Sequence, residues 1–290
     1  MKFLLTCLAS LALQPILLGQ TASSIDFTEF DLDNGLHVIL HEDHSTPIVA
    51  VTVMYHVGSK NEDPSKTGMA HFFEHLLFEG SENIERGEFD HYVENAGGVL
   101  NANTSQDRTF YYELLPSNQL ELGLWLESER MLHAKIQQIG IDTQNEVVKE
   151  EKRQRVDNQP YGSMIAETMD ACYDVHPYQW TPIGSMDHLD AATHEDFMDF
   201  YDTFYVPNNA TLSIAGDLNT DETKALVSKY FSGIPKGKKS IPRPTEIEPL
   251  RTEERRSIVY GKDRLPVVIQ AYPIPAQGTP DYYAVDLLNQ

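Results

Sequence analysis

Between residues 25 and 234, the apolar and polar positions switch repeatedly between the period of a strand and the period of a helix. Residues 27–43 contain two extended segments around an Asp-Asn-Gly turn signal at 33–35, which predicts a hairpin. Residues 47–59 are rich in β-branched side chains and predict a core strand. Residues 99–116 alternate on both sides of a polar turn and predict two more strands.

A further buried strand is predicted at residues 209–218. Helical spacing of apolar residues predicts helices in six other segments, residues 68–78, 86–98, 120–136, 143–158, 193–205 and 221–231. A Gly-Gly pair closes the helix at 86–98, and Thr193 caps the start of the helix at 193–205. The expected fold class is α+β, a mixed α/β layered domain over residues 25–234 with an antiparallel-rich sheet and helices packed on it.

The pattern changes after residue 234. Residues 235–256 combine four prolines with many charges and no periodicity, which predicts an extended linker. Residues 257–275 are strand-like, and residues 281–290 resemble the first turns of a helix. We therefore expect residues 257–290 to be the start of a second, similar domain that is incomplete in this chain.

Export is predicted by the first 22 residues. Lys2 is followed by a mostly apolar run to Leu18 and then by small or polar residues, as in a secretory signal peptide. Gln14-Pro15 interrupts the run, and no later stretch reaches the length of a membrane span. We expect a periplasmic or extracellular protein whose mature chain does not cross a membrane.

The net charge argues against one class of function, and the cysteine content argues against an internal disulfide. The formal net charge of -22 argues against nucleic-acid binding, which needs clustered Lys and Arg. Cys7 lies in the predicted signal peptide, so Cys172 is the only mature cysteine and has no partner for an internal disulfide. We interpret Cys172 as a packing residue.

The strongest chemical signal is the segment GMAHFFEHLLFEG, residues 68–80. His71 and His75 are four apart, so a helix presents both imidazoles on one face, with Cα atoms about 6 Å apart along the axis. Both rings can then converge on one zinc ion. Glu74 lies beside them, where its carboxylate can take a proton from a metal-bound water and pass it to a leaving amine.

Two histidines need a third protein ligand to form a catalytic zinc site. The charged helix at residues 143–158 offers Glu146, Glu150 and Glu151. Glu151 follows Val148 by three residues and Val147 by four, which places it on an apolar face. Glu150 also follows Val147 by three, so the periodicity favours Glu151 only modestly.

At this point the sequence resembles the pitrilysin/insulinase zinc peptidases, the inverzincins, and particularly their bacterial members similar to mitochondrial processing peptidase. The resemblance runs from about Phe27 to the end of the chain and includes NGLHVIL, GGVLNANTSQDRTFYYELLP, HPYQWTPIGSMDHLDAAT, FYVPNNATLSIAGDL and YFSGIP. In that family the third ligand is a glutamate about 75 residues beyond the motif, which matches Glu151. The resemblance implies one Zn2+ per chain held by His71, His75 and Glu151, with Glu74 as general base.

The resemblance also implies a substrate site. The strand that contains Asn101 and Ala102 is expected to be an edge that binds the main chain of an extended peptide by β-augmentation. A polar strand end is the alternative interpretation of this segment. His176 resembles the family as well, and we interpret it as structural because three ligands are already assigned.

Two departures from the family pattern concern the site and its surroundings. Many relatives carry a second glutamate seven residues before the distal ligand, whereas this chain has Gln144. Family members also close a chamber between two similar halves, and the second half contributes substrate contacts. This chain covers the first unit and the linker, so we expect a second peptidase-like half or subunit as partner.

Two functions follow as hypotheses. The first is an exported zinc metalloendopeptidase that hydrolyses short or unfolded polypeptides through a zinc-bound water activated by Glu74. The alternative is a non-catalytic, metal-retaining subunit of a two-part peptidase-like assembly. Retention of all four motif residues favours the first hypothesis. Zinc storage is disfavoured because the chain has no His-rich tract.

Overall fold

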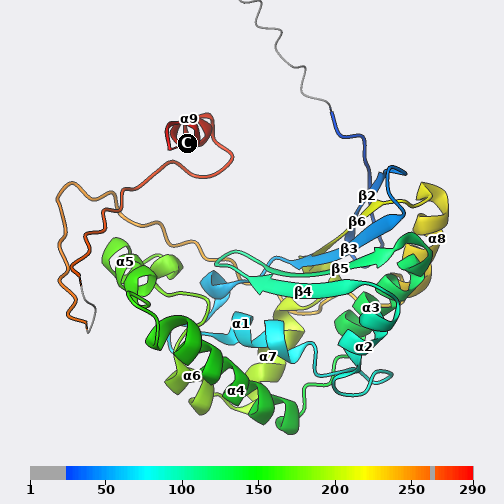
Figure 1. Cartoon of the computed structure of the whole chain (residues 1–290), viewed down its shortest axis with the longest axis horizontal. Coiled ribbons are helices and arrows are strands. Elements are labelled where there is room, and N and C mark those ends of the chain that lie inside the picture. Colours follow the sequence, from blue (N-terminus) through cyan, green and yellow to red (C-terminus); the bar gives the residue numbers. More distant parts are fainter. Residues whose placement is uncertain (1–23, 262–264, 290) are drawn as a thin grey trace, which may run out of the picture.

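The structure, a computed structural model, describes residues 24–261 and 265–289 (Figure 1). The predicted signal peptide, residues 1–22, lies outside the described residues. Six strands form one sheet in the order β1-β2-β6-β3-β5-β4. Four neighbouring pairs are antiparallel, and only β2 and β6 run parallel. The strands are β1 (Thr28–Asp31), β2 (His37–Glu42), β3 (Ile48–Tyr55), β4 (Val99–Thr104), β5 (Thr109–Pro116) and β6 (Ala210–Gly216).

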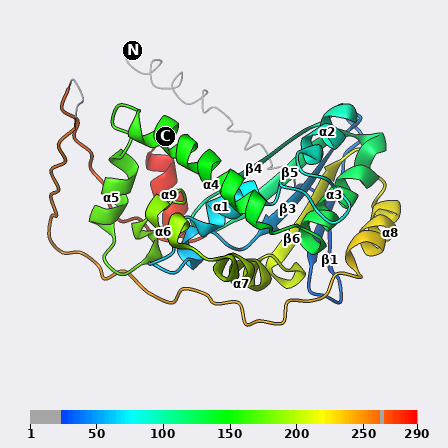
Figure 2. The ribbon, with the colours of Figure 1, turned by 90° about the horizontal axis from the view of Figure 1, so that it is seen from below.

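Helices cover one face of this sheet, as the two views show together (Figures 1 and 2). The α-helices are α1 (Met69–Leu76), α2 (Glu88–Asn95), α3 (Leu120–Leu132), α4 (Gln138–Lys152), α5 (Met164–Cys172), α6 (Met186–Ala191), α7 (His194–Phe204), α8 (Thr220–Phe231) and α9 (Pro280–Leu288). Short 3-10 turns occur at Ser59–Asn61, Ser117–Gln119, Pro177–Gln179 and Pro207–Asn209, and a π-helical turn, Arg153–Asp157, continues α4. Both views place α4 beyond α1, on the side away from the sheet (Figures 1 and 2).

The core lies between the sheet and these helices. Alternate residues of β3, among them Val49, Val51 and Val53, are fully buried, as expected for a strand with one packed face. Phe73 of α1 packs against the Tyr205 ring with centroids 5.1 Å apart. The Tyr111 hydroxyl of β5 donates a hydrogen bond to the Phe73 carbonyl oxygen at 2.9 Å. Helix α1 is therefore fixed directly on the sheet.

The predicted fold class is confirmed, and the individual elements largely agree with their predictions. The hairpin forms between β1 and β2, with Gly35 at φ 87° in its turn, a conformation that glycine adopts without a steric cost. Thr193 caps α7 as predicted, by accepting the backbone N–H of Asp196. Helices α5 and α6 were not predicted from the sequence.

Residues 235–279 contain no helix or strand in their described part. The expectation of a strand at 257–275 is therefore wrong for these residues. A strand needs a neighbour to satisfy its backbone, and none lies beside this segment, where Val268 remains 86% exposed. The helix expected at residues 281–290 is present as α9.

The segment predicted as a linker, residues 235–256, follows the surface of the layered domain. Arg243 donates a hydrogen bond to the His56 carbonyl oxygen at 2.6 Å. Farther along, the Glu248 carboxylate accepts backbone N–H groups of Asp174, Val175 and His176, each at 3.0 Å.

Among the described residues, no helix is both long enough and apolar enough to span a membrane.

Candidate metal centre

Helix α1 presents two different faces because its apolar and polar residues are segregated by helical spacing. Phe72, Phe73 and Leu76 are buried in the core. His71 and His75 lie on the side that faces α4, with ring centroids 4.9 Å apart. The sequence prediction that these two histidines share one face is therefore reproduced in the fold.

The start of α1 is determined by a residue from the preceding loop. Gly68 is the N-cap at φ 99°, and it has no side chain with which to cap the helix. The buried Glu62 carboxylate takes this role by accepting the backbone N–H groups of Gly68 at 2.9 Å and Ala70 at 2.8 Å. Trp180 Nε1 also donates to Glu62, at 3.1 Å. Sequence analysis missed Glu62, because only its contacts reveal its function as a cap.

Three side chains converge between α1 and α4. The Oε2 atom of Glu151 lies 3.1 Å from His75 Nε2 and 3.4 Å from His71 Nε2, and all three ligand atoms lie within 4.8 Å of one another. Two ligands bound tetrahedrally to one zinc ion lie about 3.3 Å apart, given bond lengths of about 2.0–2.1 Å. The donor set of two imidazoles and one carboxylate therefore fits a zinc ion both in spacing and in chemistry.

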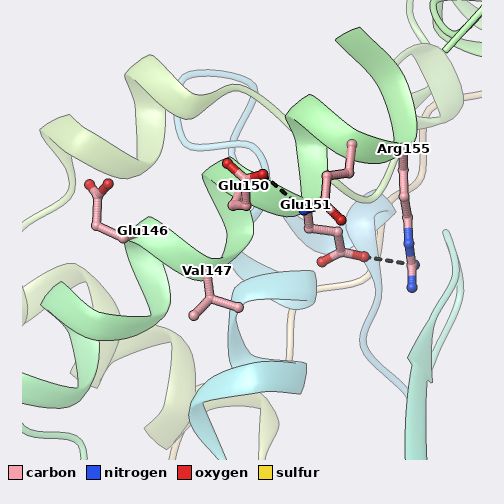
Figure 3. A pocket seen from close by; sticks show the side chains of 6 residues that line it. Glu146, Val147, Glu150, Glu151 and Arg155 are labelled. Carbon is pink, nitrogen blue, oxygen red and sulfur yellow. Dashed lines mark hydrogen bonds and ion pairs between the residues drawn. The ribbon is translucent and has the colours of Figure 1, made fainter. Parts of the chain in front are cut away.

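Burial distinguishes Glu151 from the other acidic candidates on α4. Val148 is fully buried, whereas Val147 is 44% exposed, so the apolar face that points at α1 contains Val148 and Glu151. Glu150 faces solvent and pairs with Arg153 and Gln154. Glu146 points away from Glu151 along the outer side of α4 (Figure 3). The structure therefore brings Glu151 to the two histidines and leaves Glu146 and Glu150 outside.

In the metal-free state, His71 and Glu151 already have the protonation states that metal binding requires. Burial, reinforced by the neighbouring His75, lowers the pKa of His71 to about 4, so its imidazole is neutral at pH 7. The close contact with His75 Nε2 lowers the pKa of Glu151 below its usual range. Neutral imidazole and ionised carboxylate are the forms that bind a metal. His71 Nδ1 is buried without a hydrogen-bond partner.

The other oxygen of Glu151 is also engaged. Arg155, four residues later, forms an ion pair with Oε1 at 2.7 Å (Figure 3). Its side chain is 76% exposed, so this contact lies at the rim of the site. An open hollow beside it is lined by Glu146, Val147, Glu150, Glu151, Gln154 and Arg155 (Figure 3). Sequence analysis missed Arg155, although its spacing of four from Glu151 was a usable signal.

Glu74 lies next to the three converging side chains and is held by a strand residue. Thr104 Oγ1, at the end of β4, donates a hydrogen bond to Glu74 Oε2 at 2.6 Å. Burial raises the pKa of Glu74, and this hydrogen bond opposes the shift. A carboxylate with a raised pKa is a stronger proton acceptor, as a general base requires. Thr104 was not singled out from the sequence, because its contact joins residues 30 positions apart.

Asn101 and Ala102 lie on β4, which is an edge of the sheet and pairs only with β5. The Ala102 N–H donates a hydrogen bond to the Asn101 side chain at 2.8 Å. Thr104 is two residues farther along the same strand and contacts Glu74. The outer edge of β4 therefore leads to Glu74, which lies beside the three converging side chains.

Two other residues considered in the sequence lie outside the ligand group. Gln144 donates a hydrogen bond to Glu79 Oε1 at 2.6 Å instead of approaching the histidines. His176 accepts the backbone N–H of Tyr178 at 3.2 Å, and the two rings pack edge to face with centroids 4.4 Å apart. These contacts agree with the structural interpretation of His176.

Comparisons with known proteins agree with the geometry. The family model described as "Insulinase (Peptidase family M16)" matches residues 37–179, and the model described as "Peptidase M16 inactive domain" matches residues 191–290. The "Zinc protease PqqE" of Helicobacter pylori is 36% identical over 263 residues, which are 89% of this chain and 59% of that protein. The chain therefore spans about three fifths of the length of this relative.

Two further matches are more distant. The mitochondrial-processing peptidase subunit beta of Saccharomyces cerevisiae is 25% identical over 92% of this chain and 58% of its own length. The crystal structure of the periplasmic protease PqqL from Escherichia coli superposes with a TM-score of 0.70 at 26% identity. That match covers 79% of this chain and 26% of PqqL. With the two family-model matches and the H-x-x-E-H helix, these similarities show that the chain belongs to the insulinase family of peptidases, family M16.

Proposed function

We propose that this chain is the metal-binding portion of an exported zinc endopeptidase that hydrolyses short or unfolded polypeptides. The observation that carries the proposal is the convergence of His71, His75 and Glu151 within 4.8 Å, with the Glu74 carboxylate beside them. The family membership and the name of the Helicobacter relative, a zinc protease, support the same chemistry.

His71, His75 and Glu151 would hold one zinc ion per chain. When bound, zinc polarises a scissile carbonyl and acidifies water. Glu74 accepts the proton of the attacking water and then delivers it to the leaving amine. Thr104 holds Glu74 through its hydrogen bond to Oε2, which leaves Oε1 free for the proton.

The β4 edge supplies the proposed substrate site. In the structure the Asn101 side chain accepts the Ala102 N–H. A peptide that adds to β4 as an extended strand would replace this acceptor with one of its own carbonyl oxygens. This mode uses main-chain atoms, so it suits unfolded polypeptides of varied sequence. Because β4 leads to Glu74 through Thr104, a bound strand would carry its peptide bonds past the base.

Export and a second half complete the proposal. The periplasmic location stated for PqqL agrees with the signal peptide expected at residues 1–22. The chain spans about half to three fifths of several relatives and 26% of PqqL. We infer that a second peptidase-like half or subunit closes over the substrate.

The test is Glu74→Gln, which keeps the shape of the side chain and removes the base. We expect zinc content to be unchanged and cleavage of an unstructured peptide to fall by about 10²-fold to 10⁴-fold, the usual contribution of a general base. Glu94→Gln, on an exposed position of α2, is the matched control and should cleave normally.

Metal content and chelator-sensitive cleavage are measured on this chain and on a version that continues past Gln290. Cleavage by Glu74→Gln at the wild-type rate would contradict the assigned base. Zinc binding without cleavage by either wild-type version would instead favour the non-catalytic, metal-retaining subunit.

A further inference from the structure

Glu79, just beyond the end of α1, connects this helix to α4 through a cluster of polar contacts. Its Oε1 atom accepts a hydrogen bond from Gln144 Nε2 at 2.6 Å. Its Oε2 atom pairs with Arg86 Nε, and Arg86 also donates from Nη2 to Thr143 Oγ1 at 3.1 Å. Glu79 is only 7% exposed, so its negative charge depends on these partners. These four side chains thus fasten the first half of α4 to the end of α1.

The Glu79–Gln144 contact lies on the same helix face as the ligand from α4. Gly140, Gln144, Val148 and Glu151 follow one another at spacings of four, four and three residues, which places them in one stripe. A Cβ at Gly140 would lie 3.4 Å from Glu79 Cγ, so α4 approaches closely at this point. The stripe therefore makes two polar connections to α1, through Gln144 to Glu79 and through Glu151 to His75.

We propose that Gln144 is a positioning residue for Glu151, and that it acts by donating a hydrogen bond to Glu79. This inference rests on the proposed function in one respect, namely that Glu151 is a metal ligand. Gln144 does not touch the ligand atoms. Its hydrogen bond to Glu79 fixes the distance between α4 and α1 seven residues before Glu151. This spacing holds Glu151 opposite the two histidines.

The proposal requires an uncharged amide at position 144. With glutamate there, two carboxylates would face each other across the 2.6 Å contact in a mostly buried location. Like charges at such a distance repel strongly, and Arg86 can neutralise only one of them. A glutamate at position 144 would therefore be harmful in this chain, because Glu79 already supplies the acid.

The experiment compares zinc affinity among variants, by competition with a chromophoric chelator. For Gln144→Glu we expect about 10-fold to 100-fold weaker zinc binding, the usual effect of disturbing a partner of a metal ligand. The exchange Glu79→Gln with Gln144→Glu keeps one amide and one acid in contact, and it should return the affinity to within about 3-fold of wild type. Gln144→Met removes the hydrogen bond without adding charge and should give an intermediate loss.

Gln138→Glu is the matched control, because it makes the same amide-to-acid change at an exposed position of α4. Its zinc affinity should equal that of wild type. Tighter or unchanged binding by Gln144→Glu would overturn the proposal and show that position 144 acts on the metal through its charge. Failure of the exchange variant to recover affinity would also overturn it.

The thermal midpoint of the metal-free proteins separates this proposal from the proposed function. If wild type binds no zinc, the proposed metal site fails, but the Glu79–Gln144 pairing can still be tested. Gln144→Glu should then lower the midpoint measured with excess chelator, and the exchange variant should restore it. Equal midpoints for wild type and Gln144→Glu would contradict the pairing itself.

Discussion

Helix α1 is enclosed by protein over most of its surface, whereas α4 lies mainly against solvent. Six of the eight residues of α1 are buried, including the ligand candidate His71. Of the fifteen residues of α4, only Gly140, Ile141 and Val148 are buried. Each helix nevertheless supplies part of the same candidate site. The two histidines are therefore placed by the hydrophobic core, and Glu151 is placed by a few specific contacts.

Both ends of α1 are also fixed by side chains from other parts of the chain. Glu62 caps the first turn. At the other end the buried Arg130 donates from Nη1 to the Leu77 carbonyl oxygen at 2.8 Å, with its guanidinium 4.4 Å from the centroid of the Tyr111 ring. Glu127 accepts a hydrogen bond from Arg130 at 3.0 Å and balances its charge. Among the described residues, comparable contacts on α4 are those of Thr143, Gln144 and Glu151 and pairs at its surface.

This difference in burial separates changes that affect the stability of the fold from changes that affect metal affinity. Changes that disturb α1 should affect the stability of the whole fold, because α1 is part of the core. Changes on α4 should affect metal affinity while the fold persists.

The largest effect is expected from Glu62 at the start of α1. Burial raises the pKa of Glu62 to about 8, against the opposing hydrogen bonds from Ala70, Gly68 and Trp180. Between the ordinary value of 4.5 and about 8, the folded protein holds a proton that the unfolded chain has released, so stability falls as pH rises. We expect the free energy of unfolding to fall by roughly 3 to 4 kcal/mol between pH 5 and pH 8 from this group.

Glu62→Gln cannot titrate, so it should lack this part of the pH dependence. Urea unfolding of the metal-free wild type and variant at several pH values measures the difference between their slopes. The slope is compared, because Gln also loses one acceptor oxygen and lowers stability at every pH. Parallel curves for the two proteins would show that Glu62 is not a buried, protonated cap.

An intermediate effect is expected from Glu151, the proposed metal ligand on α4. Glu151→Gln replaces an ionised ligand by a neutral one and should weaken zinc binding by roughly 100-fold or more, which is about 2.7 kcal/mol. The adjacent Glu150→Gln is the matched control, because Glu150 is exposed and pairs only with neighbours on its own helical segment. Both proteins should unfold close to the wild-type temperature without metal. Equal zinc affinities for the two variants would remove Glu151 from the site.

The smallest effect is expected from Arg155. Its ion pair with Glu151 is close, at 2.7 Å, but the arginine side chain is 76% exposed, and solvent weakens such pairs. Arg155→Gln should therefore change zinc affinity by less than about 3-fold, consistent with the small energies of exposed ion pairs. Chelator competition at low and high salt measures it. A loss as large as that of Glu151→Gln would mean that Arg155, and not the α1–α4 packing, orients the ligand.

Local patterns predicted the six strands, most helices and the residues of α1, because alternation and helical spacing are properties of neighbouring residues. His71, Glu74 and His75 lie within one helical turn, so their relative placement follows from helix geometry alone. The strand expected at 257–275 failed for the opposite reason, since a strand depends on a neighbour that the sequence pattern does not specify. The domain boundaries expected at residues 234 and 256 stay predictions.

The sequence by itself determined that two imidazoles and a carboxylate share one helix face, and its resemblance to a family pointed to Glu151. Only the tertiary structure decided that Val148, and not Val147, faces α1, which brings Glu151 to the histidines and leaves Glu150 in solvent. It also decided that Thr104 holds Glu74 and that Gln144 contacts Glu79. These contacts join residues from 30 to 76 positions apart, and they form only where packing brings separate elements together, which no local period records.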